Sequence, residues 1–396
     1  MKKNLAIIVQ KMHETGVARV AANLSTHLSD DFYNKSIITY NISETAYSFN
    51  GELINLKTAE SNNVFGKLYN LLKRYNAIKK LKKNRKIDVT VSFQLSASLI
   101  NILTRKNDKV IISIRSYLLK DNSGINKLLY KWVIKKVFKK ADLIVPVSEG
   151  IKYDLIKNYG INEEKIKVIH NYYDIEKIEE LSKEPIEEEY KTLFESPTII
   201  NSGRLVNQKG QWHLIRAFSK VKLKFPTAKL VILGNGNLEV YLKNLAKELK
   251  MESDIYFLGF KDNPFKYISK SDIYVFPSLY EGFPNALSEA MICGVPVISS
   301  DCKSGPREIL NPGMSVENPQ IQDVLFTDFG VLVPTCDGVK YQAENNLNKE
   351  EELLADSIIK LLTDEKLLKW YKNQTKIRMQ DFHQDKVIGK WEDSFK

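Results

Sequence analysis

Short apolar segments alternate with helical segments along most of the 396 residues. In the helical segments the apolar side chains recur every three or four residues, which is the spacing of an amphipathic helix. Strands that alternate with helices indicate parallel, doubly wound α/β sheets. The strand candidates lie at residues 5–9, 36–40, 88–93, 109–114 and 141–147 in the first half, and at residues 198–201, 229–233, 255–258, 273–276, 295–299 and 330–333 in the second.

The chain is long enough for two domains of this kind. Residues 175–190 are acidic and polar and include Pro185, so we expect them to connect the two domains. We predict one α/β domain over residues 1–176 and a second over residues 177–379. Residues 386–395 have the pattern of a last helix.

Positive charge is concentrated in the first half. Residues 1–184 hold 32 Lys and Arg against 19 Asp and Glu, a net charge of +13, whereas the remaining residues hold 27 and 29, a net charge of −2. This imbalance predicts an acidic partner, such as anionic lipid head groups, a diphosphate-linked molecule or a nucleic acid. No aromatic-rich basic groove motif of the stacking type is evident, so we do not expect nucleic acid as the partner.

Two predicted helices carry much of this charge. Residues 67–86 hold nine Lys and Arg and no acid, and Leu68, Leu71 and Leu72 begin an apolar repeat at helical spacing. A second basic helix is predicted over residues 125–140, with lysines at 127, 131, 135 and 139. Two interpretations remain open for both helices: a solvated basic face above an apolar face that packs on the sheet, or contact with an anionic membrane surface.

Cysteine usage and apolar runs bear on the compartment. The three cysteines, Cys293, Cys302 and Cys336, are odd in number and follow no metal-ligand spacing, which fits a reducing compartment. The apolar run at residues 5–9 is too short for a signal peptide. No apolar run reaches the roughly 18 residues of a transmembrane helix. We therefore expect a cytoplasmic protein, peripheral at the inner face of the cell membrane.

The stretch EGFPNALSE at residues 281–289 follows a strand candidate and opens a helix. Open α/β sheets bind ligands at the carboxyl ends of their strands. Gly282 permits a tight turn and the close approach of a ligand, and the Pro284-Asn285 step suits a helix entry, whose free amides favour an anion. Glu281 and Glu289 flank this entry, and their carboxylates can accept hydrogen bonds from sugar hydroxyls.

A second loop, SGRLVNQKG at residues 202–210, also lies between a strand candidate and a helix. Arg204 and Lys209 are five residues apart in this loop. A guanidinium fork and a flexible ammonium in such a loop can neutralise a diphosphate.

Both stretches resemble one family. EGFPNALSEAMICGVPVI, residues 281–298, resembles the donor-site signature of the family 4 glycosyltransferases, and SGRLVNQKG is similar to the diphosphate-binding loop of that family. SGPREIL, residues 304–310, extends the resemblance. The resemblance implies the GT-B architecture, two Rossmann-like domains facing across a cleft, with residues of about 380–396 crossing back to the first domain. It also implies sugar transfer with retention of configuration, as in bacterial synthesis of capsules, O-antigens and lipid-linked oligosaccharides.

The resemblance further implies residue roles. Arg204 and Lys209 would stabilise the leaving diphosphate and Glu281 would bind the donor sugar, which makes these three the predicted catalytic residues. Glu289 would bind the ribose. The other expected donor contacts are Gly203, Gly234, Asn235, Gly236, Phe260, Lys261, Gly282, Phe283, Pro284 and Asn285.

Two positions depart from the family pattern. After the first strand the family usually has a double glycine and an acid, and only Gly16 of this chain matches, as an expected donor contact. Many relatives have a histidine after the strand at residues 109–114, where this chain has Arg115, a candidate donor contact. No general base is assigned.

The resemblance implies transfer of a hexose or N-acetylhexosamine from a nucleoside diphosphate sugar, with UDP favoured, to a sugar acceptor linked to undecaprenyl diphosphate. No cofactor is expected, and no metal, because the chain has no Asp-x-Asp motif and its own cations can stabilise the diphosphate. The alternatives are a sugar-nucleotide epimerase of the same architecture, which needs a different acid–base set, and a basic nucleic-acid-binding protein, which leaves both motifs unexplained.

Overall fold

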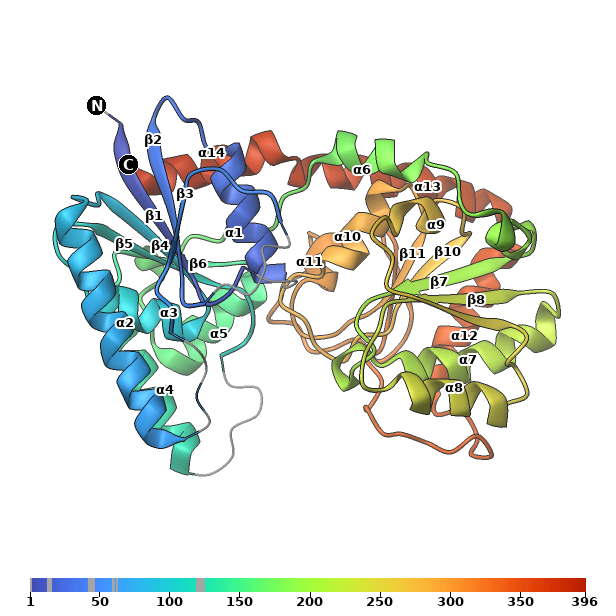
Figure 1. Ribbon diagram of the computed structural model, residues 1–396. Coiled ribbons are helices and arrows are strands. Elements are labelled where there is room, and N and C mark those ends of the chain that lie inside the picture. The colour runs from blue at the N-terminus through green and yellow to red at the C-terminus, as the bar shows by residue number, and fades with distance from the viewer. Residues whose placement is uncertain (1, 13–15, 42–46, 59–60, 62, 119–124) are drawn as a thin grey trace. The chain divides into compact units, whose positions relative to one another are not determined.

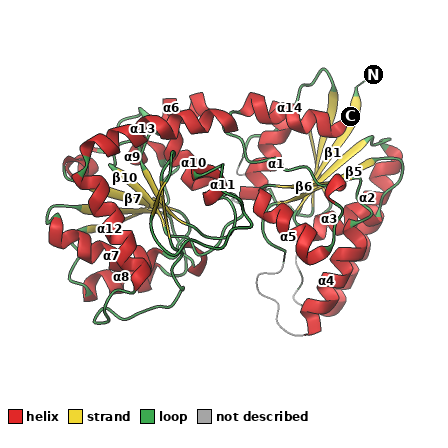
Figure 2. Ribbon diagram, turned by 180° about the vertical axis from the view of Figure 1, so that it is seen from behind, coloured by secondary structure: helices red, strands yellow, loops and turns green. Residues whose placement is uncertain are grey.

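The computed structural model describes residues 2–12, 16–41, 47–58, 61, 63–118 and 125–396 (Figure 1). Contacts divide the chain into two compact units: Met1–Tyr172 with Gln384–Lys396, and Tyr173–His383. The boundaries predicted from the sequence, after residue 176 and near residue 380, differ by a few residues from these. Figure 2 shows helices on both sides of the strands in each unit, as expected of doubly wound sheets.

The described strands of the first unit form a parallel six-stranded sheet. Its order is β3 (Glu52–Asn55), β2 (Tyr33–Thr39), β1 (Lys3–Val9), β4 (Val89–Phe93), β5 (Lys109–Ile114) and β6 (Leu143–Pro146). The chain moves outward from β1 first to one side and then, from β4, to the other. The topological switch point therefore lies between β1 and β4. Strand β3 was not predicted, because its four residues alternate too briefly to give a period.

The helices of the first unit are α1 (Gly16–His27), α2 (Val64–Asn84), α3 (Leu95–Leu103), α4 (Ile125–Phe138), α5 (Glu149–Tyr159) and α14 (Gln384–Phe395). The last of these, α14, comes from the carboxyl end of the chain yet packs beside α1 (Figure 1). Trp391 and Phe395 are buried in the same apolar cluster as Phe93 of β4. Lys3 also donates a hydrogen bond from Nζ to the carbonyl of Phe395 at 2.8 Å. The predicted return of the last helix to the first domain is confirmed.

The described strands of the second unit form a seven-stranded sheet in the order β12 (Leu325–Phe326), β13 (Val331–Val333), β11 (Val297–Ser300), β10 (Ile273–Phe276), β7 (Thr198–Ser202), β8 (Lys229–Leu233) and β9 (Ile255–Gly259). All neighbours are parallel except the short edge pair β12 and β13. Since parallel strands end at one edge, the loops after β7, β8, β9, β10 and β11 meet there.

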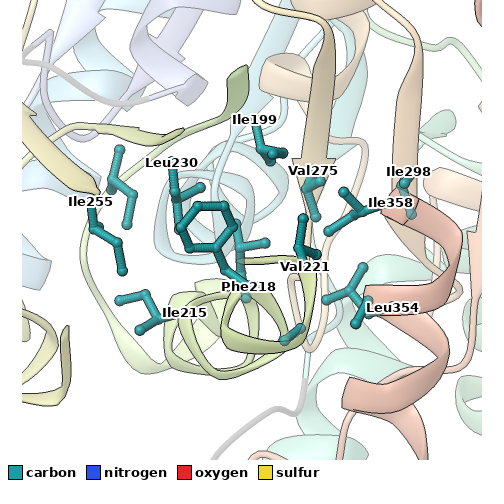
Figure 3. Packing of buried hydrophobic residues seen from close by; sticks show 14 of the residues in the cluster. Ile199, Ile215, Phe218, Val221, Leu230, Ile255, Val275, Ile298, Leu354 and Ile358 are labelled. Carbon is teal, nitrogen blue, oxygen red and sulfur yellow. The ribbon is translucent and has the colours of Figure 1, made fainter. Parts of the chain in front are cut away.

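The helices of the second unit are α6 (Ile175–Ser182), α7 (Gln211–Lys224), α8 (Glu239–Glu248), α9 (Phe265–Ile268), α10 (Asn285–Ile292), α11 (Pro306–Leu310), α12 (Lys349–Thr363) and α13 (Glu365–Met379). In Figure 3, Phe218 and Val221 of α7 lie between strand residues such as Leu230 and Val275 and residues of α12 such as Leu354. This packing fixes α7, and with it the loop that precedes it, on the sheet.

The basic helix α2 differs from the expected amphipathic helix. Ile78 is buried against the sheet, but large apolar side chains of its first half are exposed, namely Phe65, Leu68, Tyr69, Leu71 and Leu72. Lys82 is buried as well, with its Nζ 2.7 Å from Asp108 and 2.7 Å from the side-chain oxygen of Asn101. Burial lowers the pKa of Lys82, and Asp108 opposes that shift. Within the described part of the chain, no helix is long and apolar enough to cross a membrane.

Candidate active site

Three loops join at the carboxyl edge of the second sheet. Gln208 of the loop after β7 accepts a hydrogen bond from the amide of Leu279 at 2.8 Å and donates from Nε2 to the carbonyl of Tyr280 at 2.8 Å. Tyr280 forms a parallel β-bridge with Lys303, which lies in the loop after β11. The loops after β7, β10 and β11 are therefore fixed to one another through their backbones.

Within these loops Lys209 and Glu281 form an ion pair, with Nζ 2.8 Å from Oε1. Their side chains are only 16% and 10% exposed, and the ammonium also lies 4.9 Å from the centre of the Phe276 ring. A partly buried pair keeps both charges in defined positions, because few water molecules are available to replace either partner. The structure thus brings together two of the three predicted catalytic residues.

Glycines line the neighbouring part of the edge. A Cβ atom on Gly234 would lie 2.2 Å from the carbonyl oxygen of Gly203, and one on Gly236 would lie 2.2 Å from that of Leu205. Gly234 also has a φ of 122°, which L-amino acids rarely adopt. Only glycine fits at these two positions. The loops after β7 and β8 can therefore pack backbone to backbone, and the amide of Leu205 donates to the carbonyl of Asn235 at 2.9 Å. Without side chains at these glycines, a ligand can approach the backbone closely.

The loop after β9 lies against the glycines of the loop after β8. The side-chain oxygen of Asn235 accepts a hydrogen bond from the amide of Phe260 at 3.0 Å, and the amide of Gly234 donates to the carbonyl of Gly259 at 2.7 Å. The Phe260 side chain is 61% exposed next to these glycines. An exposed aromatic ring beside bare backbone can stack against a planar base.

The turn after Glu281 is fixed from the loop after β11. Ser304 donates a hydrogen bond to the carbonyl of Gly282 at 2.7 Å. Gly305, with a φ of 90°, lies so close that a Cβ atom there would be 2.5 Å from Cδ of Pro284. Phe283 is buried and its ring lies edge-on to that of Phe382, 5.3 Å away. These contacts hold the entry of α10 in one conformation.

Asn285 is the first residue of α10, and its side-chain oxygen accepts a hydrogen bond from the Tyr173 hydroxyl at 3.0 Å. Glu289 is buried one turn further along the same helix. Its negative charge helps to raise the pKa of Cys293, for which burial is the larger cause. Glu281 and Glu289 therefore flank the first turn of α10, as the spacing of EGFPNALSE indicates.

The other predicted residues lie in different settings. The Arg204 side chain is exposed in the loop between Gly203 and Lys209. Lys261 lies over the rings of Tyr190 and Tyr267, at 4.8 and 5.3 Å, so the structure does not place its ammonium with the loop cluster. Gly16, the first residue of α1, and Arg115, which follows β5, belong to the first unit. Their roles in donor binding stay predictions.

Sequence reasoning missed the residues that support the site. Gln208 and Ser304 fix the loops. Lys303 is exposed between buried neighbours, and its backbone pairs with that of Tyr280, the residue before Glu281. The SGP sequence at residues 304–306 was the available signal for the tight turn. Among the residues that the structure describes, no three His, Cys, Asp or Glu side chains are grouped so as to hold a metal ion.

Comparison with known proteins identifies the family. Residues 15–177 match the family model described as Glycosyltransferase Family 4, and residues 182–324 match the model described as Glycosyl transferases group 1. Among solved structures, Anabaena HepE in complex with UDP has a TM-score of 0.72 at 17% identity and covers 100% and 99% of the two chains. A glycosyltransferase from Rickettsia africae has a TM-score of 0.73 at 18% identity, covering 100% and 98%. These likenesses show the fold.

Two relatives are closer in sequence. An uncharacterised glycosyltransferase of Methanocaldococcus jannaschii is 36% identical over 337 residues, 82% of each chain. The N-acetylgalactosamine-N,N'-diacetylbacillosaminyl-diphospho-undecaprenol 4-alpha-N-acetylgalactosaminyltransferase of Campylobacter jejuni is 31% identical over 397 residues, 97% of each chain. With both family models and both domains matched, the chain belongs to the family 4 glycosyltransferases and has the GT-B fold.

Proposed function

We propose that this glycosyltransferase moves a hexose or N-acetylhexosamine, with retention, from a nucleoside diphosphate sugar to a sugar acceptor on a lipid diphosphate. UDP is the favoured nucleotide, because a UDP complex is known for a protein of the same fold. The acceptor class is supported by the name of the Campylobacter relative, which acts on an undecaprenol-linked sugar. Such a reaction belongs to bacterial surface polysaccharide synthesis. The observation that carries the proposal is the Lys209–Glu281 pair beside the glycine-lined loops.

The barrier of the reaction lies in breaking the bond between the anomeric carbon and the phosphate. Arg204, Lys209 and the free amides at the start of α10 would stabilise the negative charge that grows on the diphosphate. Glu281 pairs with Lys209 and fixes the position of its ammonium. With donor bound, Glu281 would accept hydrogen bonds from the sugar hydroxyls, and Glu289 from the ribose.

Retention follows in this proposal from attack of the acceptor hydroxyl on the same face that the diphosphate leaves. The leaving phosphate takes the proton of the attacking hydroxyl, so no protein base is required. The cations of the loop after β7 replace a metal, and no cofactor takes part.

We further propose that the first unit contacts the inner face of the cytoplasmic membrane. The first half of α2 exposes Phe65, Leu68 and Leu72 near Lys67 and Lys73, which are also exposed. Apolar side chains among lysines are typical of helices that lie in the interface of an anionic bilayer. A peripheral position of this kind would bring the enzyme to a lipid-linked acceptor.

A melting-temperature panel with UDP-, GDP- and ADP-sugars tests the donor proposal, because a ligand that binds only the folded state raises the melting temperature. Stabilisation by one nucleotide sugar, followed by its transfer to a lipid-linked acceptor, is the expected result. Conversion of the donor to its epimer without acceptor would identify the epimerase instead. No stabilisation by any nucleotide sugar would contradict the proposed function.

A further inference from the structure

The first unit has its own cluster of polar residues at the topological switch point of its sheet. Gln10 follows β1, Tyr40 follows β2 and Gln94 follows β4, and these three strands are neighbours in the order β2, β1, β4. In open α/β sheets, the crevice at the carboxyl ends beside the switch point is the usual place for a ligand. None of these three residues is used in the donor site described above.

The cluster is held together by hydrogen bonds. The Gln10 amide donates to Oε1 of Gln94 at 3.1 Å, and Nε2 of Gln10 donates to the Ser96 hydroxyl at 2.6 Å. The Tyr40 amide donates to the carbonyl of Gln10 at 3.2 Å. Tyr40 itself is buried beside Ser96, and burial raises its pKa to about 12, so the phenol is neutral.

Two polar atoms of the cluster remain available. Nε2 of Gln94 and Oε1 of Gln10 make no hydrogen bond to any residue that the structure describes. Both side chains are partly exposed. One atom is a donor and the other an acceptor, which is the combination that a hydroxyl or an acetamido group satisfies.

The backbone of Gln94 is strained. Its φ of 70° and ψ of 151° lie in a region that is almost exclusive to glycine. Strain of this kind persists where the surrounding structure imposes it, and such residues concentrate at active and binding sites. In this conformation the Gln94 side chain lies against Gln10, whose amide donates to its Oε1 at 3.1 Å.

The charge of the cluster limits its ligand. Gln10, Gln94, Ser96 and Tyr40 are all neutral. The adjacent Arg74 lies 4.1 Å above the Tyr40 ring and donates to the side chain and the carbonyl of Thr58 at 2.9 and 3.1 Å. Its guanidinium is therefore already engaged by the protein. The cluster therefore offers carboxamides and a hydroxyl but no unpaired charged side chain. Such a cluster favours a neutral sugar over a uronic acid or a phosphate.

We infer that Gln10, Gln94 and Ser96 bind a neutral pyranose of the acceptor, through its hydroxyl or acetamido groups. The inference rests on the proposed transfer reaction, and it assigns the sugar-recognising part of the acceptor to the edge of the first sheet. The diphosphate and lipid of the acceptor lie outside this cluster.

Gln94→Gly is the sharpest test, because glycine adopts the observed φ and ψ without strain while the carboxamide is lost. Asn34→Ala is the matched control, because it also loses a carboxamide. Asn34 lies near the amino end of β2, at the opposite end of the strands from the cluster, where its side chain donates to that of Asn4 at 3.0 Å. The acceptor probes are octyl N-acetyl-α-D-galactosaminide and octyl β-D-glucuronide. The donor is the UDP-sugar that stabilises the wild type most.

Gln94→Gly should raise the KM for the octyl N-acetylgalactosaminide about five- to tenfold, the factor of one lost neutral hydrogen bond. The KM for the UDP-sugar should change less than about twofold, and the melting temperature should not fall. Gln10→Ala should act in the same direction, and Asn34→Ala should leave both KM values unchanged. The wild type should use the glucuronide far less well than the neutral glycoside.

An unchanged acceptor KM in Gln94→Gly, or a rise in the donor KM alone, would overturn this assignment while the proposed transfer reaction stands. Absence of nucleotide-sugar binding by the wild type would instead overturn the proposed function. Saturation-transfer NMR of the octyl N-acetylgalactosaminide with the UDP-loaded protein tests the cluster without turnover. Equal saturation transfer to Gln94→Gly and wild type would likewise exclude the cluster.

Discussion

The Lys209 ammonium lies 2.8 Å from the Glu281 carboxylate, and the two residues come from loops after different strands of one sheet. The pair joins the SGRLVNQKG loop to the EGFPNALSE loop at the carboxyl edge. Gln208 also fixes the two loops to each other. In the proposed function, the diphosphate and the donor sugar would meet at this pair. The first prediction concerns these two side chains.

Lys209→Ala and Glu281→Ala should each reduce kcat/KM about a hundredfold, because in the proposed function each removes one group that would contact the reacting part of the donor, a loss of roughly 3 kcal/mol. Lys220→Ala provides the control, since Lys220 lies on α7 of the same unit and pairs with Asp356 at 2.7 Å. Circular dichroism should show that all three variants are folded. Turnover within about twofold of wild type by either folded site variant would remove that residue from the mechanism.

The second prediction concerns metal removal. Transfer should persist in excess EDTA, because Arg204 and Lys209 supply positive charge in the loop that we propose binds the diphosphate. The measurement is the initial rate with and without chelator, and with Mg²⁺ or Mn²⁺ added back. Loss of activity in EDTA that either ion restores would show that the cations of the protein are insufficient.

The repeating strand and helix pattern predicted the fold because buried parallel strands are mostly apolar and alternate with segments of helical period. Strands such as Lys109–Ile114 and Lys229–Leu233 are found at the predicted positions. Periodicity alone does not reveal which face of a helix another element covers. For this reason Lys82, one of many lysines in its segment, was not recognised as buried, and Leu68 was not recognised as exposed.

The site was predictable only as far as its motifs extend. EGFPNALSE and SGRLVNQKG identify Glu281 and Lys209, but their pairing depends on strand order, which joins residues 72 positions apart. Ser304 and Gln94 were missed for a related reason. Their positions depend on positive φ angles, of 69° and 70°, at residues that are not glycine, and no composition signal reports this strain.

A third prediction concerns a buried network behind the loop after β13. The Glu351 carboxylate is fully buried, 2.8 Å from Nδ1 of His213 and 3.0 Å from Nε of Arg216. Glu351→Ala would leave Arg216 buried without its carboxylate, which costs about 3–5 kcal/mol. The melting temperature should fall by about 6–20 °C in differential scanning calorimetry. Glu365→Ala, at an exposed position that starts α13, should change it by less than about 2 °C; equal effects of the two substitutions would contradict the prediction.

The fourth prediction concerns acid. A hydrogen bond from the Tyr267 hydroxyl, 2.5 Å long, lowers the pKa of Glu187 from 4.5 to about 2, with a smaller contribution from Lys266. A lowered pKa means that the stability from this carboxylate is present above about pH 4.5 and is lost as the pH falls toward 2. Glu187→Gln should therefore melt below wild type at pH 6, and the gap should narrow at pH 3. A difference in melting temperature between the variant and wild type that grows as the pH falls would contradict the assigned direction of the Glu187 pKa shift.

The last prediction concerns the membrane. The exposed lysines of the second half of α2 are Lys79, Lys80 and Lys83, whereas Lys82 is buried in its pair with Asp108 and has to be left intact, because its substitution would unpair a buried carboxylate.

In liposome flotation, wild-type recovery should rise when phosphatidylglycerol is added to phosphatidylcholine vesicles and fall in high salt, since each surface lysine contributes about 1 kcal/mol near an anionic bilayer. Changing the three exposed lysines of α2 to Gln should reduce recovery on anionic vesicles. Changing Leu68, Leu71 and Leu72, the exposed leucines of the first half, to Ser should reduce recovery further, because the change removes the apolar side chains that would enter the bilayer interface in this proposal. The matched control changes three exposed lysines of the second unit, Lys243, Lys247 and Lys250, to Gln, and it should bind like wild type.

An equal loss of recovery in the control would show that only the net charge of the protein matters, not the position of the lysines on α2. Equal recovery of wild type on neutral and anionic vesicles would contradict the membrane proposal. The transferase would then have an acceptor that does not require membrane contact through α2.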